Sequence, residues 1–284
     1  MEGTIYPTDL TDEQWELIRP YIPRSKSGTR KGGRPPTDVR MVVNGLMYLV
    51  RTGCAWRMLP RDFGPWPTVH HYYRTWRGDG TLQKVYDALR RKVRIQAGRK
   101  PSPPRRSSTA GGENRGNRGA RGYDAGKKIK GRKRPIVVDT LGLILAVVVH
   151  AADIQDRDGA ELVPARLVGR FSRLKWIRAD GGYAGKMIEW TYQLGCWVLQ
   201  IVKRGDDVTG FVVLPKRWIV ERTFAWFNRY RRLSKDYETL PKSSDSMIYP
   251  AMIHLGSVSK QQVMPIVFHD DMEVGVYETT RAYG

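Results

Sequence analysis

Asp180 stands at the end of a predicted β-strand, where its carboxylate could bind a ligand or a metal ion. The strand covers residues 174–179, and two glycines follow the aspartate. Open α/β sheets bind their ligands at the carboxyl ends of strands, so a carboxylate at this position is a candidate site residue. An ordinary turn aspartate before two glycines would give the same pattern. Spacing alone leaves both interpretations open.

Glu221 is the second acidic candidate, and it lies in a segment, residues 217–233, that is predicted to be one long helix. It belongs to a narrow polar stripe between two apolar sides, together with Ala225, Asn228 and Arg232. A carboxylate held between apolar surfaces is costly unless it is paired or binds a cation. Asp180 and Glu221 would supply the hard oxygen ligands that Mg²⁺ prefers in phosphoryl-transfer enzymes. A salt bridge from Glu221 to Arg217 is the structural alternative.

The chain as a whole is strongly basic. Its 284 residues include 49 Lys+Arg against 28 Asp+Glu, a formal net charge of +21. Such an excess indicates a polyanionic partner, either nucleic acid or an anionic membrane surface. The 40% hydrophobic content excludes a wholly disordered basic protein. Most of the chain is therefore expected to fold.

Several other classes of protein are excluded by simple features of the sequence. The longest apolar stretch, residues 141–152, is too short to span a membrane. The first residues lack the layout of a signal peptide. Cys54 and Cys196 lie far apart without metal-ligand spacing, which argues against a zinc finger or a disulfide framework. We expect a cytoplasmic protein that binds nucleic acid and no membrane.

Four helices are predicted before residue 98. A capping box at Thr11–Gln14 predicts the start of a helix over residues 12–19. The spacing of apolar residues predicts three more helices, over residues 39–53, 68–77 and 81–95. Thr68 is predicted to be the N-cap of the helix over 68–77. The third of these helices has a basic face formed by His70, His71, Arg74 and Arg77. Helices joined by a tight turn, with a basic face on the later one, fit a helix-turn-helix that reads the major groove of DNA. A helical bundle with a solvated charged face is the alternative, and the net charge favours DNA.

Further basic residues are candidate DNA contacts. Arg34 follows two glycines and precedes two prolines, so it could insert into a narrow groove, or it could belong to a flexible basic linker. A dense run after Tyr123 would suit a phosphate backbone, or it could be a solvated approach to a strand. The run consists of Lys127, Lys128, Lys130, Arg132, Lys133 and Arg134.

The composition changes abruptly over residues 99–122. This stretch has no Val, Ile, Leu, Met or aromatic residue, so we expect an Arg/Gly/Pro-rich linker with nothing to bury. An Arg-Gly segment that binds RNA is the functional alternative. From residue 123 onward, apolar strand patterns alternate with helical ones, which predicts an α/β unit. Its first two strands, near residues 136–138 and 143–149, read as a buried hairpin.

Long phrases of the sequence resemble bacterial insertion-sequence transposases with an Asp-Asp-Glu centre, of the insertion-sequence-five type. The resemblance covers about residues 5–100 and 120–255. The phrases are YPTDLTDEQW, VNGLMYLVRTGCAWRMLP, RGYDAGKKIKGRKRPIVVDTLGLILAVVVHAADIQDRDGA, ADGGYAGK and LPKRWIVERTFAWFNRYRRLSKDYE.

The resemblance implies a helical DNA-binding domain over residues 1–98, the linker over 99–122, a ribonuclease-H-like transposase domain over 123–256, and a divergent tail over 257–284. It implies strand cleavage and transfer at terminal inverted repeats and target DNA, with Mg²⁺, or Mn²⁺ in its place. It further implies a location at the bacterial nucleoid and leaves a homodimer open. By position, Asp180 matches the second catalytic aspartate and Glu221 the catalytic glutamate.

The match to the wider superfamily is incomplete around this glutamate. Arg217 and Glu221 fit its Arg-x-x-x-Glu pattern. That pattern has Tyr and Lys where this chain has Leu214 and Asn228, so contacts to the DNA end would need another basic residue. Arg229 or Arg232 could substitute.

The family's first aspartate is missing. It normally ends an apolar run on the first, central strand, but residues 104–120 contain no Asp and no strand pattern. A frame-shifted reading would explain this, because codons for Ser108–Ala110 can encode Asp-Ser in another frame. Asp124 and Asp139 are the nearest acidic replacements, and we expect neither to reach the site. Glu113 is a remote third option, on a segment with nothing to hold it rigid. We therefore expect a domain that lacks its first strand and a copy impaired in catalysis. A non-catalytic DNA-binding protein derived from a transposase is the alternative.

Overall fold

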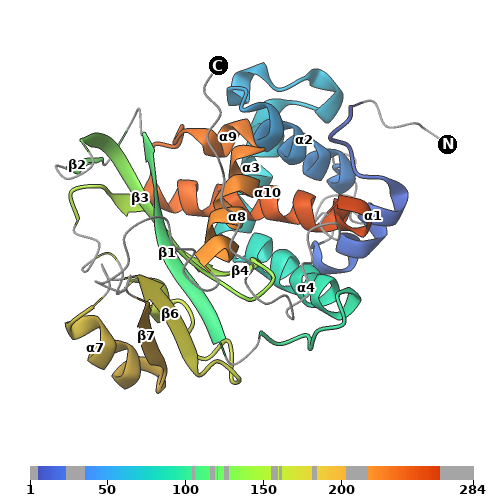
Figure 1. Cartoon of the computed structure of the whole chain (residues 1–284). Coiled ribbons are helices and arrows are strands. Elements are labelled where there is room, and N and C mark those ends of the chain that lie inside the picture. Colours follow the sequence, from blue (N-terminus) through green and yellow to red (C-terminus); the bar gives the residue numbers. More distant parts are fainter. Residues whose placement is uncertain are drawn as a thin grey trace, which may run out of the picture.

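A computed structural model of the chain describes residues 6–23, 36–103, 106–115, 119, 121–124, 128–154, 159, 162–180, 184–202 and 217–262. Helices from both ends of the chain pack together on one side of a mixed β-sheet (Figure 1). Arg34, Lys127 and Leu214 lie outside the described residues.

The helices before residue 98 follow local signals closely. They are α1 (Asp12–Ile18), η1 (Arg19–Tyr21), α2 (Val39–Thr52), η2 (Trp56–Met58), η3 (Arg61–Phe63), α3 (Trp66–Gly78) and α4 (Thr81–Gln96). The capping box of Thr11 with Gln14 is confirmed. At the end of α2, Gly53 adopts a φ of 70°, a left-handed conformation that glycine adopts without strain.

The predicted N-cap at Thr68 is wrong. Helix α3 begins two residues earlier, at Trp66, and Pro65 precedes it. Pro67 fits the first turn of the helix, because a backbone N–H there would have no partner within the helix. Thr68 therefore lies inside the helix.

The sheet is built around strand β1 (Arg106–Arg115). Its other strands are β2 (Gly122–Asp124), β3 (Ile129–Val138), β4 (Ile144–Val147), β5 (His150–Ala151), β6 (Trp176–Asp180) and β7 (Val198–Val202). The strand order is β2-β3-β1-β6-β7, and β4 and β5 also pair with β3. Strand β1 is antiparallel to β3 and parallel to β6, and β6 is parallel to β7. The predicted hairpin is confirmed as the antiparallel pair β3 and β4.

The expectation that residues 104–120 contribute no strand is wrong. Strand β1 falls within the predicted linker and occupies the centre of the sheet, where Ser107 and Thr109 are buried. The hydroxyl of Thr109 donates a hydrogen bond of 2.8 Å to the carbonyl of Ile136 on β3. Residues 108–115 pair with β3 and residues 106–108 pair with β6, so strand neighbours override the weak β-propensity of these residues.

The remaining helices are α6 (Leu162–Ala165), α7 (Lys186–Gly195), α8 (Arg217–Asn228), α9 (Arg231–Ser234) and α10 (Pro241–Gln262). The long helix predicted over residues 217–233 is interrupted, because Tyr230 adopts an extended conformation between α8 and α9. Helix α10 extends beyond the predicted end of the domain at residue 256. No helix in the described part of the chain is long and apolar enough to cross a membrane.

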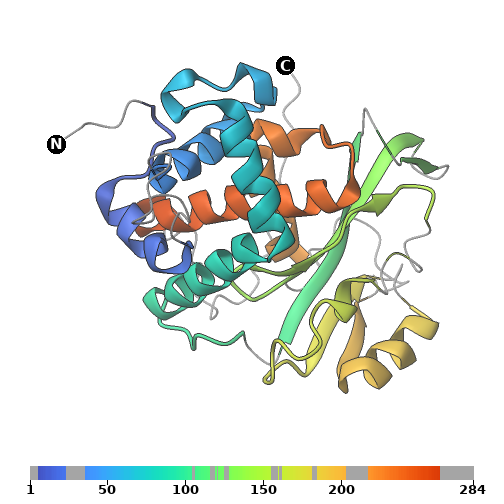
Figure 2. The same cartoon turned by 180° about the vertical axis from the view of Figure 1, so that it is seen from behind.

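One hydrophobic core joins the two ends of the chain. It contains Leu46 of α2, Leu89 of α4 and Phe227 of α8, together with a buried run of α10. Figure 2 shows α10, in orange and red, crossing behind α3 with one end toward the sheet, and α10 packs against α2 and α4. The core also includes Ile136 and Val138 from one face of β3. The predicted helical domain therefore shares its core with the segment that follows the sheet.

A second, smaller core covers the other face of the sheet. Val137 of β3, Ile177 of β6 and Leu199 of β7 contribute to it, and Val163 of α6 and Met187 of α7 pack with them. Alternate residues of β3 thus point into different cores. This alternation assigns each strand position to one face of the sheet. Helix α8 packs against β1 and β3 on the face that carries Ile136 and Val138.

Two buried ion pairs connect the sheet to the helices. Arg94 of α4 lies 2.5 Å from Asp139, in the turn between β3 and β4. Arg132 of β3 lies 2.9 Å from Asp236, which follows α9, and both side chains are 1% exposed. Asp139 also accepts hydrogen bonds from the amides of Leu141 and Leu143. The prediction that Asp139 does not serve the catalytic site is consistent with this structural role.

The Arg132–Asp236 pair gives a test of the fold. Arg132→Met keeps an aliphatic side chain but leaves the Asp236 carboxylate buried without its counter-charge, so we expect a loss of about 3–5 kcal/mol in the free energy of unfolding. Urea denaturation measures this loss. Arg91→Met, at an exposed position on α4, removes the same charge and should change stability by less than about 0.5 kcal/mol. Equal effects of the two variants would contradict the role given to the pair.

Candidate functional site

Asp180 is the last residue of β6, and its backbone pairs with Val202, the last residue of β7. It thus stands at the carboxyl end of two adjacent parallel strands, as the strand pattern predicts. Its side chain lies outside the described part of the structure. Strand β6 neighbours β1, so Asp180 lies near the middle of the sheet rather than at an edge.

Glu221 lies on the exposed face of α8. Ala225 and Asn228 share that face, as the predicted stripe requires. Arg232, the fourth member of the predicted stripe, lies on α9 and is buried, so the stripe does not extend to it. The stripe is open to solvent rather than enclosed, because the neighbouring apolar residues Val220 and Phe227 turn toward the core. Exposure removes the desolvation cost that burial would impose on the Glu221 carboxylate. The side chain of Arg217 is outside the described residues, so the salt bridge predicted as an alternative stays a prediction.

Strand alternation identifies a third position on the face of the sheet that α8 covers. Ser108 of β1 pairs with Val138 of β3 and with Arg178 of β6. Directly paired residues point to the same face, and Val138 lies in the core that includes α8. Ser108 is half-buried. Among the residues of β1 on this face whose side chains are described, Ser108 is the one nearest to Asp180 in the register.

The donor set for a metal ion is incomplete on β1. Asp180 and Glu221 offer carboxylate oxygens, which suit Mg²⁺, while Ser108 offers only a hydroxyl. Among the described side chains, no group of three or more His, Cys, Asp and Glu residues could hold a metal ion. Asp124 ends the edge strand β2, which β3 and β1 separate from β6. Asp180, Glu221 and Ser108 therefore offer two carboxylate ligands rather than three.

Half of the predicted phosphate-binding run is not available to DNA. Arg132, Lys133 and Arg134 are between 1% and 6% exposed, which corrects their prediction as phosphate contacts. Alternation along β3 does not leave them in solvent, because both faces of the strand are covered. Burial lowers the pKa of Arg134 to about 10. Lys128 and Lys130 are exposed and remain candidates.

Arg232 is also used inside the protein. Its Nε and Nη2 atoms donate to Oε1 of Glu238 at 2.9 and 2.6 Å, and its Nη1 atom donates to the carbonyl of Cys54 at 2.8 Å. Arg232 is only 7% exposed, which does not fit its predicted role at a DNA end. Arg229 is exposed, and its carbonyl accepts a hydrogen bond from Arg51.

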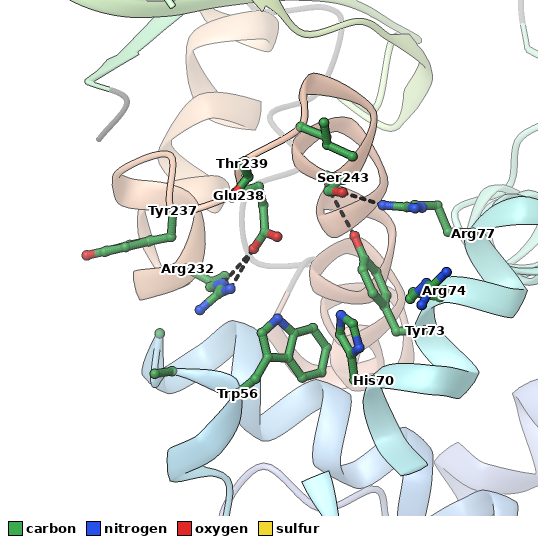
Figure 3. A pocket seen from close by; sticks show the side chains of 13 residues that line it. Trp56, His70, Tyr73, Arg74, Arg77, Arg232, Tyr237, Glu238, Thr239 and Ser243 are labelled. Carbon is green, nitrogen blue, oxygen red and sulfur yellow. Dashed lines mark hydrogen bonds and ion pairs between the residues drawn. The ribbon is translucent and has the colours of Figure 1, made fainter. Parts of the chain in front are cut away.

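Three of the four basic residues predicted on α3 line one pocket. His70, Arg74 and Arg77 face a cavity of about 860 Å³ whose opposite wall is formed by the segment from α9 to the start of α10 (Figure 3). Arg232 and Glu238 belong to that wall. His71 is exposed on the same helix but does not line the pocket.

Hydrogen bonds connect the two walls of this pocket. The hydroxyl of Tyr73 donates to the carbonyl of Ser243 at 2.8 Å, and Arg77 donates to the Ser243 hydroxyl. Burial raises the pKa of Tyr73 well above its usual value, so its hydroxyl stays protonated. Burial and the nearby Arg74 lower the pKa of His70, which favours neutral imidazole. The positive charge of the pocket therefore comes from arginines.

Aromatic side chains complete the pocket, and sequence reasoning missed them. Trp56 packs against His70 and Tyr73, with ring centroids 4.8 and 5.5 Å apart. Tyr237 stands on the other wall and is 39% exposed. Trp56 and Tyr237 come from segments far apart in the chain, so no spacing rule could have connected them.

Comparisons with known proteins agree on one family. Residues 79–254 match the family described as "Transposase DDE domain", which is more than half of the chain. Residues 10–86 match the family described as "Putative transposase of IS4/5 family". The two matches meet near α4, close to the boundary between the first helices and the sheet.

Two relatives are each similar to about a third of this chain. A protein of Sinorhizobium fredii named "Uncharacterized protein y4sN" is 32% identical over 87 residues, which cover 31% of this chain and 67% of the relative. A Burkholderia cepacia protein named "Insertion element IS402 uncharacterized 16.2 kDa protein" is 32% identical over 88 residues, which cover 30% of this chain and 60% of the relative. This chain thus spans less than two thirds of the second relative.

Proposed function

The chain belongs to the transposase DDE domain family, and from this premise we propose that it is the DNA transposase of an insertion sequence. In this proposal it binds terminal inverted repeats and cleaves and transfers DNA strands with the help of a divalent cation. The single observation that carries the proposal is the position of Asp180 at the carboxyl end of β6, beside the central strand β1.

The strand order supports a ribonuclease-H-like catalytic domain. The first strand, β1, is central, with antiparallel strands on one side and the parallel strands β6 and β7 on the other. Helix α8 follows the last strand in sequence and packs against β1. This arrangement brings the helix of Glu221 to the same region of the sheet as the strand of Asp180.

Asp180 and Glu221 would hold the cation, and Mg²⁺ fits their oxygen ligands best, with Mn²⁺ as its substitute. When bound, such a cation supplies charge stabilisation at a phosphodiester and lowers the pKa of a bound water molecule. The residues of this chain would present the two carboxylates to the cation and position the DNA. The exposed face of α8 leaves Glu221 accessible to a DNA strand.

Exposed basic side chains would position double-stranded DNA, both the terminal repeats and the target. They include His71, Arg74, Lys128, Lys130 and Arg229. Each phosphate contact makes the affinity for DNA more sensitive to salt. A homodimer associated with the bacterial nucleoid would accommodate two DNA ends.

We further propose that this copy cleaves DNA poorly. The sheet retains its first strand, but the residues of β1 that pair with β6 are Arg106, Ser107 and Ser108, and none of them is a carboxylate. A non-catalytic DNA-binding protein is the second candidate, and the same missing carboxylate favours it. The two candidates differ in residual strand cleavage.

Strand nicking tests the role of the two acidic residues. On DNA that carries the element's own terminal repeats, in Mg²⁺, we expect slow nicking that Asp180→Asn and Glu221→Gln each reduce by about a hundredfold or more, because each removes a metal ligand. Glu189→Gln, at an exposed position on α7, should nick like the unaltered protein. Salt-sensitive binding with no nicking above background would favour the non-catalytic candidate.

Restoring a carboxylate on β1 tests the explanation for weak cleavage. Ser108→Asp should raise the nicking rate by at least about tenfold if the third ligand is what the site lacks. The half-buried position tolerates a charge, because the paired residue on β6 is Arg178, whose Nη1 atom has no hydrogen-bond partner among the described residues. Ser108→Asn has nearly the same shape without the charge and should not raise the rate. Equal rates for the two variants would overturn the explanation.

A further inference from the structure

Two exposed apolar side chains lie where η1 meets α4. Tyr21 of η1 is 40% exposed, and Ile95 of α4 is 57% exposed. Lys92 connects them, because its Nζ atom lies 5.5 Å from the centre of the Tyr21 ring and Ile95 follows it by three positions on α4. We call the surface formed by Tyr21, Lys92 and Ile95 the η1–α4 patch. Neighbouring apolar side chains that stay exposed mark a surface that another apolar segment could cover.

Helix α10 ends close to this patch. Tyr249 of α10 packs against Tyr86, and Gly256 lies against Leu89 and Val93, so α10 and α4 advance side by side in the same direction. Helix α10 continues beyond Gly256 to Gln262 and also contacts α1. In Figure 2, the red end of α10 and the end of α4 lie on the side of the molecule away from the sheet, with α1 beside them. The chain therefore leaves α10 near the η1–α4 patch.

The sequence that follows α10 is apolar first and acidic afterwards. Residues 263–268 read VMPIVF, and Asp270, Asp271 and Glu273 come directly after this run. Six extended residues span about 20 Å, which is enough to cross the patch from the end of α10. An apolar run of this length gains free energy by leaving water.

The charges near the patch favour one direction for the acidic residues. Between Asp87 and Glu113 the sequence has eight Arg and Lys residues and no Asp or Glu. Arg99 and Lys100, just beyond the end of α4, are exposed. Helix α1, which leads to Tyr21, is acidic in its first turn. Attraction to the first surface and repulsion from the second would direct an acidic segment toward the end of α4.

We propose that residues 263–273 fold back over the η1–α4 patch. The apolar run covers Tyr21 and Ile95, and the acidic residues lie beside Arg99 and Lys100. The inference goes beyond the proposed function and does not depend on it, since it concerns a contact within the chain and takes no DNA. It gives the segment after α10 a docking surface on the first helices.

Hydrogen exchange of the full-length protein, followed by mass spectrometry, tests the inference. The amides of residues 263–268 should exchange about tenfold more slowly than those of an unstructured peptide of the same sequence, because docking restricts them. Ile95→Gln keeps a good helix former but removes the apolar surface, so exchange should return to within about twofold of the rate in the peptide. Ile95→Leu should retain the protection.

Ile188→Gln is the matched control. Ile188 is 43% exposed on α7, outside the patch, and its substitution should leave the exchange of residues 263–268 unchanged. Exchange of the unaltered protein at the rate of the free peptide would overturn the inference. Protection that survives Ile95→Gln would also overturn it, because the segment would then dock elsewhere or continue α10. None of these results bears on DNA binding or strand cleavage.

The position of the acidic residues has a separate test. Replacing Asp270, Asp271 and Glu273 by their amides should lower the protection of residues 263–268 about threefold, because attraction to the end of α4 is lost. Protection that is unchanged by these three substitutions would overturn the placement of the acidic residues beside Arg99 and Lys100.

Discussion

A buried guanidinium must find its counter-charge inside the protein, and this constraint organises the molecule. Arg132 reaches from β3 to Asp236 and also donates to the carbonyls of Glu238 and Thr239, at 2.8 and 2.7 Å. The segment held in this way forms a wall of the pocket. Arg94 makes the corresponding link from α4 to Asp139 at the other end of the sheet. Part of the large positive charge thus holds helices against strands, and only the exposed remainder is available to a polyanion.

Local signals in the sequence predicted much of the fold, and long-range effects account for the rest. Helix α1 carries its own capping box, and α2 and α7 have an apolar face, so neighbouring residues determine them. Strand β1 was missed because its residues have low β-propensity and become a strand only between two partners. Helix α10 was not predicted. It is buried on most sides, so its apolar residues do not recur at the spacing of a single helix face, and Pro250 lies inside it.

The candidate site divides in the same way. The positions of Asp180 at a strand end and of Glu221 on a helix could be predicted, because both depend on local sequence pattern. The basic run of β3 was misread, since residue type does not reveal that both faces of a strand are covered. The pocket was missed because its aromatic residues meet only through tertiary packing. The sheet also keeps β1 in register with Ser108, and no carboxylate, as the last residue paired to β6, which separates what the fold requires of this strand from what the proposed catalysis requires.

The central claim is that Asp180 and Glu221 share one divalent cation. A crystal structure of the full-length protein with Mn²⁺, in which anomalous scattering locates the ion, is the most direct measurement. The account predicts a peak whose distances to carboxylate oxygens of both residues are about 2.0–2.6 Å. Ordered carboxylates that lie too far apart to reach one ion, or Mn²⁺ bound only elsewhere, would contradict it.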